Sequence, residues 1–276
     1  MFRRGLACLV LALAAAVALG TAPALAQPDA VTVGVGDQNL YSLDLGTGVA
    51  TLIGATGADD IRAIAFAPDG TLYGVDEHFG AGNVDELVTI DPSTGASTVV
   101  GLLGFDVQNT GLTFGVDGRM WLSDSQNPRL FEVDPATGAA TLVGSTTGFF
   151  ISGLAGACDG RILGAGLNPS TSDFELVSLD TSTGAATSVG SFGIGVSNAD
   201  IAFDYASQTL YGVEQNDSIF TIDPATGAAT VVGTIVDPGG QLTHNLAIDP
   251  ITCPPPPPAP LAPPPEPVVV TPAFTG

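Results

Sequence analysis

The amino-acid sequence predicts an all-β fold, a five-bladed β-propeller whose blades each contain four antiparallel strands. A segment of eleven residues, beginning with Asp and ending with Gly, recurs along the chain. The copies start at Asp44, Asp91, Asp134, Asp180 and Asp223, so their spacings are 47, 43, 46 and 43 residues. Such spacing is typical of a propeller blade, which takes ~40–50 residues. The 36 Gly, the 21 Pro and the lack of Lys also favour strands and turns over helices.

Each full repeat divides into four short strands. The first is small and apolar and covers residues 63–67, 111–115, 153–157 and 200–204. A turn follows, which carries Asp-Gly in three copies, and then the second strand at residues 71–75, 119–123, 161–165 and 209–213. The third strand covers residues 87–90, 130–133, 176–179 and 219–222. The fourth is the Thr-x-Val-Gly stretch that ends each copy.

The Asp-Pro-x-Thr-Gly link between the third and fourth strands is explained by hairpin geometry. Asp can accept hydrogen bonds from backbone amides ahead of it, and Pro presets φ for a type I turn. Gly takes the left-handed position of a bulge. We therefore assign these Asp residues to turn formation rather than to ligand binding.

The two ends of the repeat region supply the remaining blade. Three strands precede the first full blade, at residues 31–35, 40–43 and 50–54, and one first-strand segment follows the last, at residues 245–249. Together they make a fifth blade closed by strands from both termini, which leaves no open edge. A sandwich and a larger oligomeric ring are the alternatives.

Residues 1–26 have the features of a secretory signal peptide, so the mature chain is expected to begin at Gln27. An Arg pair precedes an apolar run, residues 6–19, and residues 24–26 match an Ala-x-Ala cleavage site. The run is short for a transmembrane span. We expect an exported protein, secreted or located in the periplasm or cell envelope, with no membrane span after cleavage.

The propeller is expected to occupy residues 27–252, and a proline-rich tail residues 253–276. The tail contains two proline runs, residues 254–258 and 263–265. Such a composition cannot pack a core and favours an extended polyproline II conformation. We expect a disordered arm or a spacer.

The repeat resembles those of secreted bacterial β-propeller proteins of uncharacterised families, similar in layout to the NHL and YVTN repeat propellers. The resemblance rests on Leu-Tyr-Gly-Val followed by Leu-x-x-Ile-Asp-Pro-x-Thr-Gly-Ala-x-Thr-x-Val-Gly, and it covers about residues 31–249. It implies the fold and carries no catalytic motif. Two copies depart from it: the hairpin at Asp44 lacks the Pro, and residues 153–157 lack the Phe.

Candidate binding residues lie on the face that carries the longer, variable loops. Both histidines, His78 and His244, fall in these loops, and binding residues usually occupy variable loops on a rigid scaffold. Residues that begin the innermost strands should surround the channel mouth and could hold a divalent metal or a small polar ligand. This channel-mouth set is Arg62, Thr110, Ser152, Asn198, Asp200, His244 and Asn245. The alternative is that these groups only solvate the strand ends.

No cofactor is predicted, although the acids would admit Ca²⁺, a cation that prefers oxygen ligands. Several acids follow the second strand in different blades, and we expect them to lie too far from the axis to share one ion: Asp37, Asp76, Glu77, Asp124 and Glu214. Zinc is disfavoured, because the sequence has neither paired Cys ligands nor a His-Glu-x-x-His motif. A Gly-x-Ser-x-Gly nucleophile motif is also missing.

The two cysteines of the mature chain are expected to be unpaired thiols. Cys158 and Cys253 both follow a first strand, in blades that are not neighbours in a five-bladed ring. A disulfide needs Cα atoms about 4.4–6.8 Å apart. A bridge stays open as the alternative, because the residues beyond Asp249 could reach. For Trp121, packing between blades is favoured over a sugar-stacking platform.

The charge excludes polyanionic partners. The chain has 28 Asp and Glu against 6 Arg, a formal charge of −22, and so has no basic patch for nucleic acid or anionic lipid. We expect a monomeric, non-enzymatic scaffold that binds a small polar ligand, a glycan or an extracellular protein through its acidic, loop-rich face. The alternative is a metal-assisted lactonase or a glycan-active hydrolase or lyase that uses the channel-mouth set.

Overall fold

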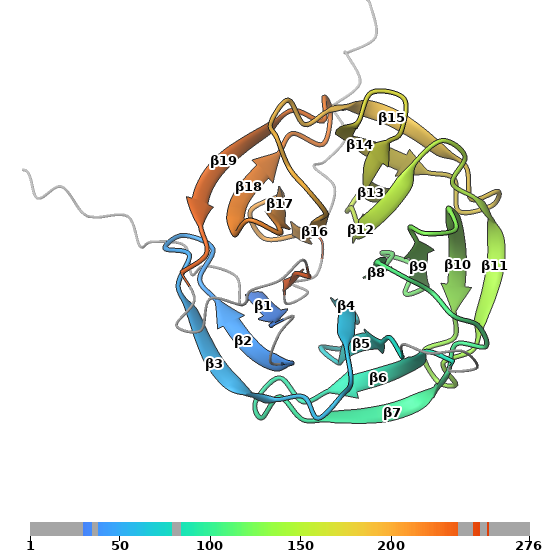
Figure 1. Ribbon diagram of the computed structural model, residues 1–276, viewed down its shortest axis with the longest axis vertical. Coiled ribbons are helices and arrows are strands. Elements are labelled where there is room, and N and C mark those ends of the chain that lie inside the picture. Colours follow the sequence, from blue (N-terminus) through green and yellow to red (C-terminus); the bar gives the residue numbers. More distant parts are fainter. Residues whose placement is uncertain (1–29, 35–37, 79–83, 237–244, 249–252, 254–276) are drawn as a thin grey trace, which may run out of the picture.

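The computed structural model describes residues 30–34, 38–78, 84–236, 245–248 and 253. Within these residues, twenty strands form five four-stranded antiparallel sheets, arranged as blades around a central axis (Figure 1). The predicted five-bladed β-propeller is confirmed. The predicted signal peptide and the tail beyond Cys253 lie outside the described residues. The described part contains no helix with the length and apolarity needed to cross a membrane.

Four blades are continuous in sequence, each running from the innermost to the outermost strand. Blade 1 contains β4 (Ile61–Phe66), β5 (Leu72–Asp76), β6 (Glu86–Ile90) and β7 (Ser97–Leu102). Blade 2 contains β8 (Thr110–Phe114), β9 (Met120–Asp124), β10 (Arg129–Val133) and β11 (Ala140–Ser145). Blade 3 contains β12 (Phe150–Gly156), β13 (Ile162–Asn168), β14 (Asp173–Leu179) and β15 (Ala186–Ser191). Blade 4 contains β16 (Ala199–Asp204), β17 (Thr209–Glu214), β18 (Ser218–Ile222) and β19 (Ala229–Thr234).

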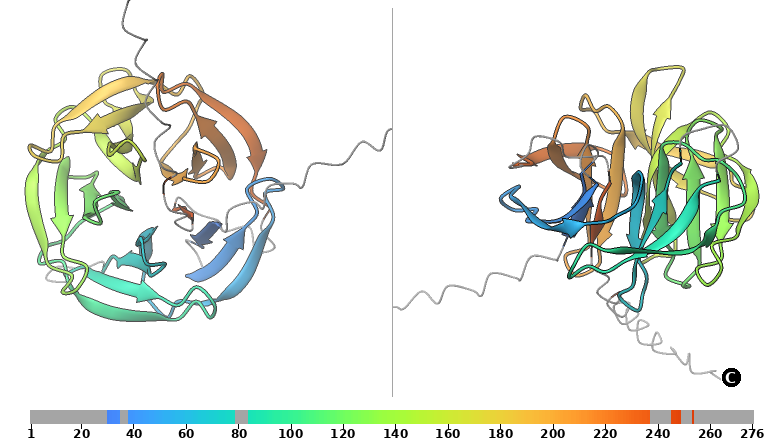
Figure 2. Two further views of the ribbon diagram at one scale, coloured as in Figure 1. Left: turned by 180° about the vertical axis from the view of Figure 1, so that it is seen from behind. Right: turned by 60° about the horizontal axis from the view of Figure 1, so that its bottom comes forward.

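The fifth, closing blade combines both ends of the described chain, as predicted. Its order is β20 (Ala247–Ile248), β1 (Ala30–Val33), β2 (Asn39–Leu43) and β3 (Ala50–Ala55). Ala30 pairs with Ile248 and Val31 with Ala247, so the first and last strands lie side by side (Figure 2). The closing strand β20 is shorter than the predicted segment 245–249, and Asp249 lies outside the described residues.

The hydrophobic core is divided among the five contacts between neighbouring blades. Each of the five buried clusters draws its side chains mainly from one pair of adjacent blades. Trp121, for example, is 1% exposed and belongs to a cluster with Ile151 and Val177 across the contact between blades 2 and 3. This confirms packing between blades as its role. Burial therefore stabilises the contact of each blade with its neighbours.

The hairpins between third and fourth strands have the predicted geometry. In each copy the Asp carboxylate accepts a hydrogen bond from the amide two residues ahead, as Asp134 does from Ala136 at 2.9 Å. Hydrogen bonds lower the pKa of each of the five Asp residues: in Asp91 and Asp180 mainly those from the Ser93 and Ser182 hydroxyls, followed by the backbone amides, and in the other three mainly those from the backbone amides. The hairpin Gly has a positive φ in every blade, for example 79° at Gly138. Turn formation thus accounts for the repeated Asp and for this Gly.

The second Gly of the repeat, at the end of the fourth strand, has a different reason: it touches the hairpin of the next blade. A Cβ added at Gly101 would lie 2.1 Å from the carbonyl oxygen of Thr137, and one at Gly138 would lie 2.6 Å from that of Gly101. Equivalent contacts occur at Gly54, Gly144 and Gly190. At the last junction the contact slips by one residue, so Thr234 rather than Gly233 meets Gly48. These Gly–Gly contacts join neighbouring blades along the rim.

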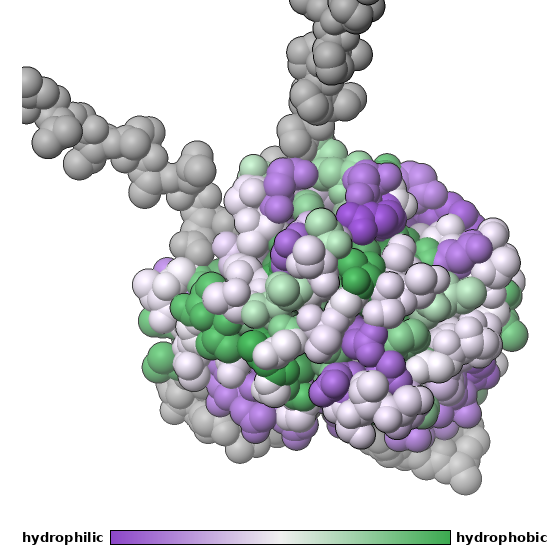
Figure 3. Space-filling view, turned by 90° about the horizontal axis from the view of Figure 1, so that it is seen from above, coloured by the Kyte–Doolittle hydropathy of each residue, from purple (hydrophilic) through white to green (hydrophobic). Residues whose placement is uncertain are grey.

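The rim also carries exposed apolar side chains. The residue after Thr in the fourth strand is more than half exposed in four blades: Leu52, Val99, Leu142 and Val231. Val49, Val232 and Val236 add to this surface where blade 4 meets the closing blade, and Val49 there forms a parallel bridge with Val236. Figure 3 shows apolar surface gathered on this side of the rim.

The expectation of unpaired thiols is wrong: Cys158 and Cys253 form a disulfide, with Cα atoms 5.6 Å apart. All inner strands run toward the same end of the channel, so the turn that carries Cys158 and the chain that leaves β20 emerge on one face. Cys253 lies five residues beyond Ile248, and five residues can extend over roughly 17 Å, so its thiol can reach a turn of another blade. The disulfide therefore ties the chain beyond the closing strand to a turn of blade 3, which is not a neighbour of the closing blade along the ring.

Candidate functional site

The predicted channel-mouth set lies at the inner strands, where most of its described members bond one blade to the next. Ser152 Oγ donates to the Ala199 carbonyl at 2.7 Å, joining blade 3 to blade 4. Asp200 accepts from the Leu246 amide at 2.8 Å, joining blade 4 to the closing blade. Asn245 donates to the Ile61 carbonyl at 3.3 Å, joining the closing blade to blade 1.

Two further hydrogen bonds complete this circle around the channel. Thr110 Oγ1 donates to Glu77 Oε1 at 3.3 Å, between blades 2 and 1. Ser123 Oγ donates to the Ile151 carbonyl at 3.0 Å, between blades 2 and 3. Every junction between neighbouring blades thus has a side-chain hydrogen bond. Four of these blade-joining side chains, Thr110, Ser152, Asp200 and Asn245, were expected near strand ends from the sequence, but the sequence pattern did not indicate their partners.

The members of the channel-mouth set differ in burial and in hydrogen bonding. Asp200 is fully buried, and burial raises the pKa of its carboxyl well above the usual value, against hydrogen bonds from Leu246 and Ile201 that lower it. Asn198 has a positive φ of 55°, and its buried Oδ1 has no hydrogen-bond partner among the described residues. Arg62 forms an ion pair with Asp60 at 2.7 Å. His244 lies outside the described residues.

A concentration of acids lies beside this set, in the loops of blade 1. This blade-1 acidic cluster consists of Asp59, Asp60, Asp76, Glu77, Asp85 and Glu86, with Arg62 and His78 among them. Two loops bring it together, one leading from β3 into β4 and the other linking β5 to β6. Asp76 fastens the first loop by accepting hydrogen bonds from the amides of Asp59 and Asp60, at 3.1 and 2.8 Å.

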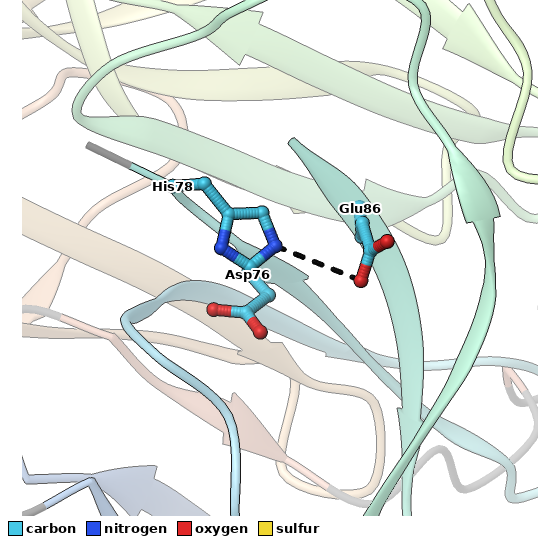
Figure 4. Close-up of side chains that lie close together, drawn as sticks. All are labelled: Asp76, His78 and Glu86. Atoms are coloured by element: carbon cyan, nitrogen blue, oxygen red, sulfur yellow. Dashed lines mark ion pairs between the residues drawn. The ribbon is translucent and has the colours of Figure 1, made fainter. Parts of the chain in front are cut away.

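His78 lies between acids from both loops. Its Nδ1 is 3.0 Å from Asp59 Oδ2, and its Nε2 is 3.6 Å from Glu86 Oε2 (Figure 4). The amide of His78 donates to Asp85 Oδ1 at 2.8 Å. The other Asp85 oxygen accepts from the Val107 amide at 2.6 Å, so Asp85 also holds the loop that leads into blade 2. The imidazole is therefore fixed by backbone and side-chain contacts.

Burial and like charges shift the titration of this cluster. Burial raises the pKa of Glu77 to about 8; Arg62 opposes the shift, and Asp85 and Asp60 add to it. Burial also raises the pKa of Asp85, against the amide hydrogen bonds from Val107 and His78. For His78, burial lowers the pKa but Asp76, Asp59 and Glu86 together raise it. The carboxylates of this cluster repel one another, and a cation bound among them would reduce that repulsion.

The Glu77→Gln variant should lose a pH dependence of stability. The pKa of Glu77 is about 8 in the folded protein, against an ordinary 4.5, so the folded state holds a proton that the unfolded state releases above pH 4.5. The stability that this carboxyl contributes is full below about pH 4.5 and falls as the pH rises through about 8, by up to roughly 1.4 kcal/mol per pH unit. Urea unfolding of the chelator-treated wild type and of the Gln variant, between pH 5.5 and 8.5, measures how steeply the free energy of unfolding of each protein changes with pH. Equal slopes for the wild type and the Gln variant would contradict the assignment.

The opposite end of the channel holds an apolar cavity of about 260 Å³. All five inner strands line it, together with turn residues and one end of the disulfide; Phe66, Phe114, Phe203, Tyr205 and Cys253 are among its lining residues. The lining contains no Asp, Glu, Arg or His among the described residues. The channel is therefore polar at the loop face and apolar at the face with the short turns.

The loops that form the blade-1 acidic cluster were recognised in the sequence as variable, and Asp76, Glu77 and His78 were noted there. Asp59, Asp85 and Glu86 were not singled out. One signal was available for the last two: blade 1 alone has an Asp-Glu pair at the start of its third strand. The approach of Asp59 to His78 depends on how two loops fold against each other.

Comparisons with known proteins identify the architecture. No protein-family model matches the chain, and no curated protein does. Among solved structures, a chain of a nidogen/laminin complex is similar, with 12% identity, a TM-score of 0.56 and coverage of 82% of this chain and 99% of that one. PQQ-bound aldose sugar dehydrogenase from Streptomyces coelicolor has 14% identity and a TM-score of 0.51, covering 81% of this chain and 82% of that one.

TolB from Acinetobacter baumannii also matches, at 17% identity and a TM-score of 0.49, over 77% of this chain and 52% of TolB. At such identities the similarity shows the fold alone. Proteins of the β-propeller fold thus include a member of a protein complex and a dehydrogenase, and the fold does not select between binding and catalysis. The resemblance to secreted bacterial repeat propellers stays a prediction.

Proposed function

We propose that this protein is an exported, non-enzymatic binding scaffold whose blade-1 acidic cluster, at the loop-rich channel mouth, holds a cationic group of its ligand. The observation that carries the proposal is the excess of carboxyl groups in the cluster: six lie with one arginine and one histidine. Glu77 is largely protonated at neutral pH, and Asp59 and Glu86 are the carboxyl groups most open to solvent. Such a surface attracts cations and raises their association rate. A small amine or a basic segment of an extracellular protein has the matching charge.

Export is supported by two features. The N-terminal residues have the pattern of a cleaved signal peptide, and a disulfide such as Cys158–Cys253 persists in oxidising compartments outside the cytosol. The scaffold role is supported by the channel-mouth set. Ser152, Asp200 and Asn245 form hydrogen bonds to the neighbouring blade, so these side chains have a structural role. Arg62 and Thr110 are the members of the set that adjoin the cluster.

Binding of a fluorescent oligo-lysine peptide, followed by anisotropy, tests the proposal. We expect saturable binding that weakens with salt, and a loss of about tenfold or more in affinity when Asp59→Asn and Glu86→Gln are combined, since each charge pair near a protein surface contributes on the order of 1 kcal/mol. A charge-matched control combines Asp117→Asn with Asp173→Asn, both exposed and away from the cluster. An equal loss in this control would show attraction by the net charge alone and would refute the site.

A further inference from the structure

We propose that Asp76, His78 and Glu86 form a binding site for a divalent transition-metal ion with nitrogen and oxygen ligands, such as Zn²⁺ or Mn²⁺. One ligand atom from each residue lies within 4.8 Å of the others. The inference goes beyond the proposed function, because it concerns an ion held by three side chains whether or not a cationic partner binds the same face.

The histidine is oriented as a metal-binding histidine usually is. A ligating imidazole typically donates its second ring N–H to a carboxylate, which fixes the tautomer and turns the other nitrogen toward the metal. In His78, Nδ1 lies 3.0 Å from Asp59 Oδ2, and Nε2 faces Glu86 (Figure 4). Asp59 is thus placed to position the ligand from outside the site.

The spacing of the ligand atoms suits an ion between them. Two atoms that each lie about 2.1 Å from an ion are roughly 3.4 Å apart in tetrahedral geometry. The distance between His78 Nε2 and Glu86 Oε2 is 3.6 Å, which is longer than a hydrogen bond and close to this value. The largest separation in the set, within 4.8 Å, requires a shift of about 1.4 Å at most.

The three ligands differ in mobility in a way that allows this shift. Asp76 is buried and anchored by the amides of Asp59 and Asp60, so it forms the fixed side of the site. The side chains of His78 and Glu86 are 20% and 24% exposed, which gives an ion access from solvent. Glu86 begins β6, and its long side chain can close onto the ion.

The chemistry of the donors selects the class of metal. Imidazole nitrogen with carboxylate oxygen suits zinc and other first-row ions, whereas Ca²⁺ prefers six to eight oxygen ligands. From the sequence, Ca²⁺ was allowed and zinc was disfavoured, because the chain has neither paired Cys ligands nor a His-Glu-x-x-His motif. Here the ligands come from two strand ends and the loop between them, and further positions on the ion would be filled by water. Asp59, Asp60 and Asp85 supply additional negative charge nearby.

Isothermal titration of the tag-free, chelator-treated mature chain with Zn²⁺, Mn²⁺ and Ca²⁺ measures the site. We expect one saturable Zn²⁺ site, weakened at least tenfold by His78→Ala and by Glu86→Gln, and unchanged by the control Asp173→Asn. Asp59→Asn should weaken it by about ten- to a hundredfold, the usual effect of removing an outer-shell partner. Co²⁺ gives an independent signal, because its visible absorption should appear in the wild type and be absent from the His78 variant.

Several outcomes would overturn the proposal. These are Zn²⁺ binding that is unchanged in both the His78 and Glu86 variants, no saturable Zn²⁺ binding by the wild type, and tighter binding of Ca²⁺ than of Zn²⁺. Circular dichroism of each variant checks that it folds, and Glu86→Gln, at a partly exposed position, preserves the test if His78→Ala does not fold. Oligo-lysine binding measured with a chelator present separates the two proposals. Peptide binding without a metal site refutes only the metal, and a metal site without peptide binding refutes only the proposed function.

Discussion

Reduction of the Cys158–Cys253 disulfide is expected to lower the free energy of unfolding by about 4 kcal/mol. The bridge joins residues 95 positions apart, and a loop of that length restricts the unfolded chain strongly, by roughly 4–5 kcal/mol in the loop-entropy description. The bridge also restrains the chain beyond β20, a strand of two residues that pairs with β1 through Ala247 and Ile248. Its loss should therefore weaken the closing blade first.

Urea unfolding with and without reductant measures this effect. The wild type should unfold at a lower urea concentration when reduced, and the double variant Cys158→Ser/Cys253→Ser should behave like the reduced wild type under both conditions. Hydrogen exchange at the amides of β1 and β20 should show the largest loss of protection. An unchanged unfolding midpoint on full reduction, verified by thiol titration, would contradict the prediction.

Replacement of Gly101 by alanine is expected to destabilise the propeller by about 3 kcal/mol or more, the upper part of the range for overpacking a close contact. The new Cβ would lie 2.1 Å from the carbonyl oxygen of Thr137, a backbone atom that cannot rotate away. Relief requires blades 1 and 2 to separate at the rim, which would disturb the apolar cluster between them.

The chain provides a matched control for this substitution. Gly233 occupies the same place in the repeat of blade 4, but a Cβ there would meet only Ile219 side-chain atoms, at 3.8 and 3.9 Å. Gly233→Ala should change stability by less than about 1 kcal/mol and can even stabilise, because alanine restricts the unfolded chain. Chemical unfolding of both variants is the measurement. Equal destabilisation would mean that the contact between blades is not what requires glycine at this position.

The sequence was sufficient for the fold because the repeat encodes its local rules in every copy. The hairpin Asp and Gly determine the geometry of each turn, and the repeat spacing indicates a four-stranded blade. The unmatched strands at the two ends indicate that the ring closes through a blade shared between them. The role of the second Gly, as at Gly101, could not be inferred in this way. Its partner, Thr137, belongs to the next blade, and its closeness depends on how the blades pack.

The candidate site was less accessible to sequence analysis. Thr110, Ser152, Asp200 and Asn245 were expected at the starts of inner strands, but their hydrogen bonds cross between blades and follow no spacing in the chain. The disulfide was misjudged for a related reason. Cys158 and Cys253 were compared by their order around the ring, whereas the inner strands converge on a narrow axis.

The way the propeller closes also governs the order in which it can fold. Ala30 and Ile248, the paired residues of β1 and β20, are 218 positions apart in the chain. Contacts between residues so distant in sequence form slowly, since the entropy of closing the loop is lost before the contact is gained. Blades 1 to 4 use mostly local hairpins and can form while the chain is still being made, from the N-terminal side onward. The closing strand comes last in the chain, so we expect ring closure, and the disulfide beside it, to be the last and slowest step of folding.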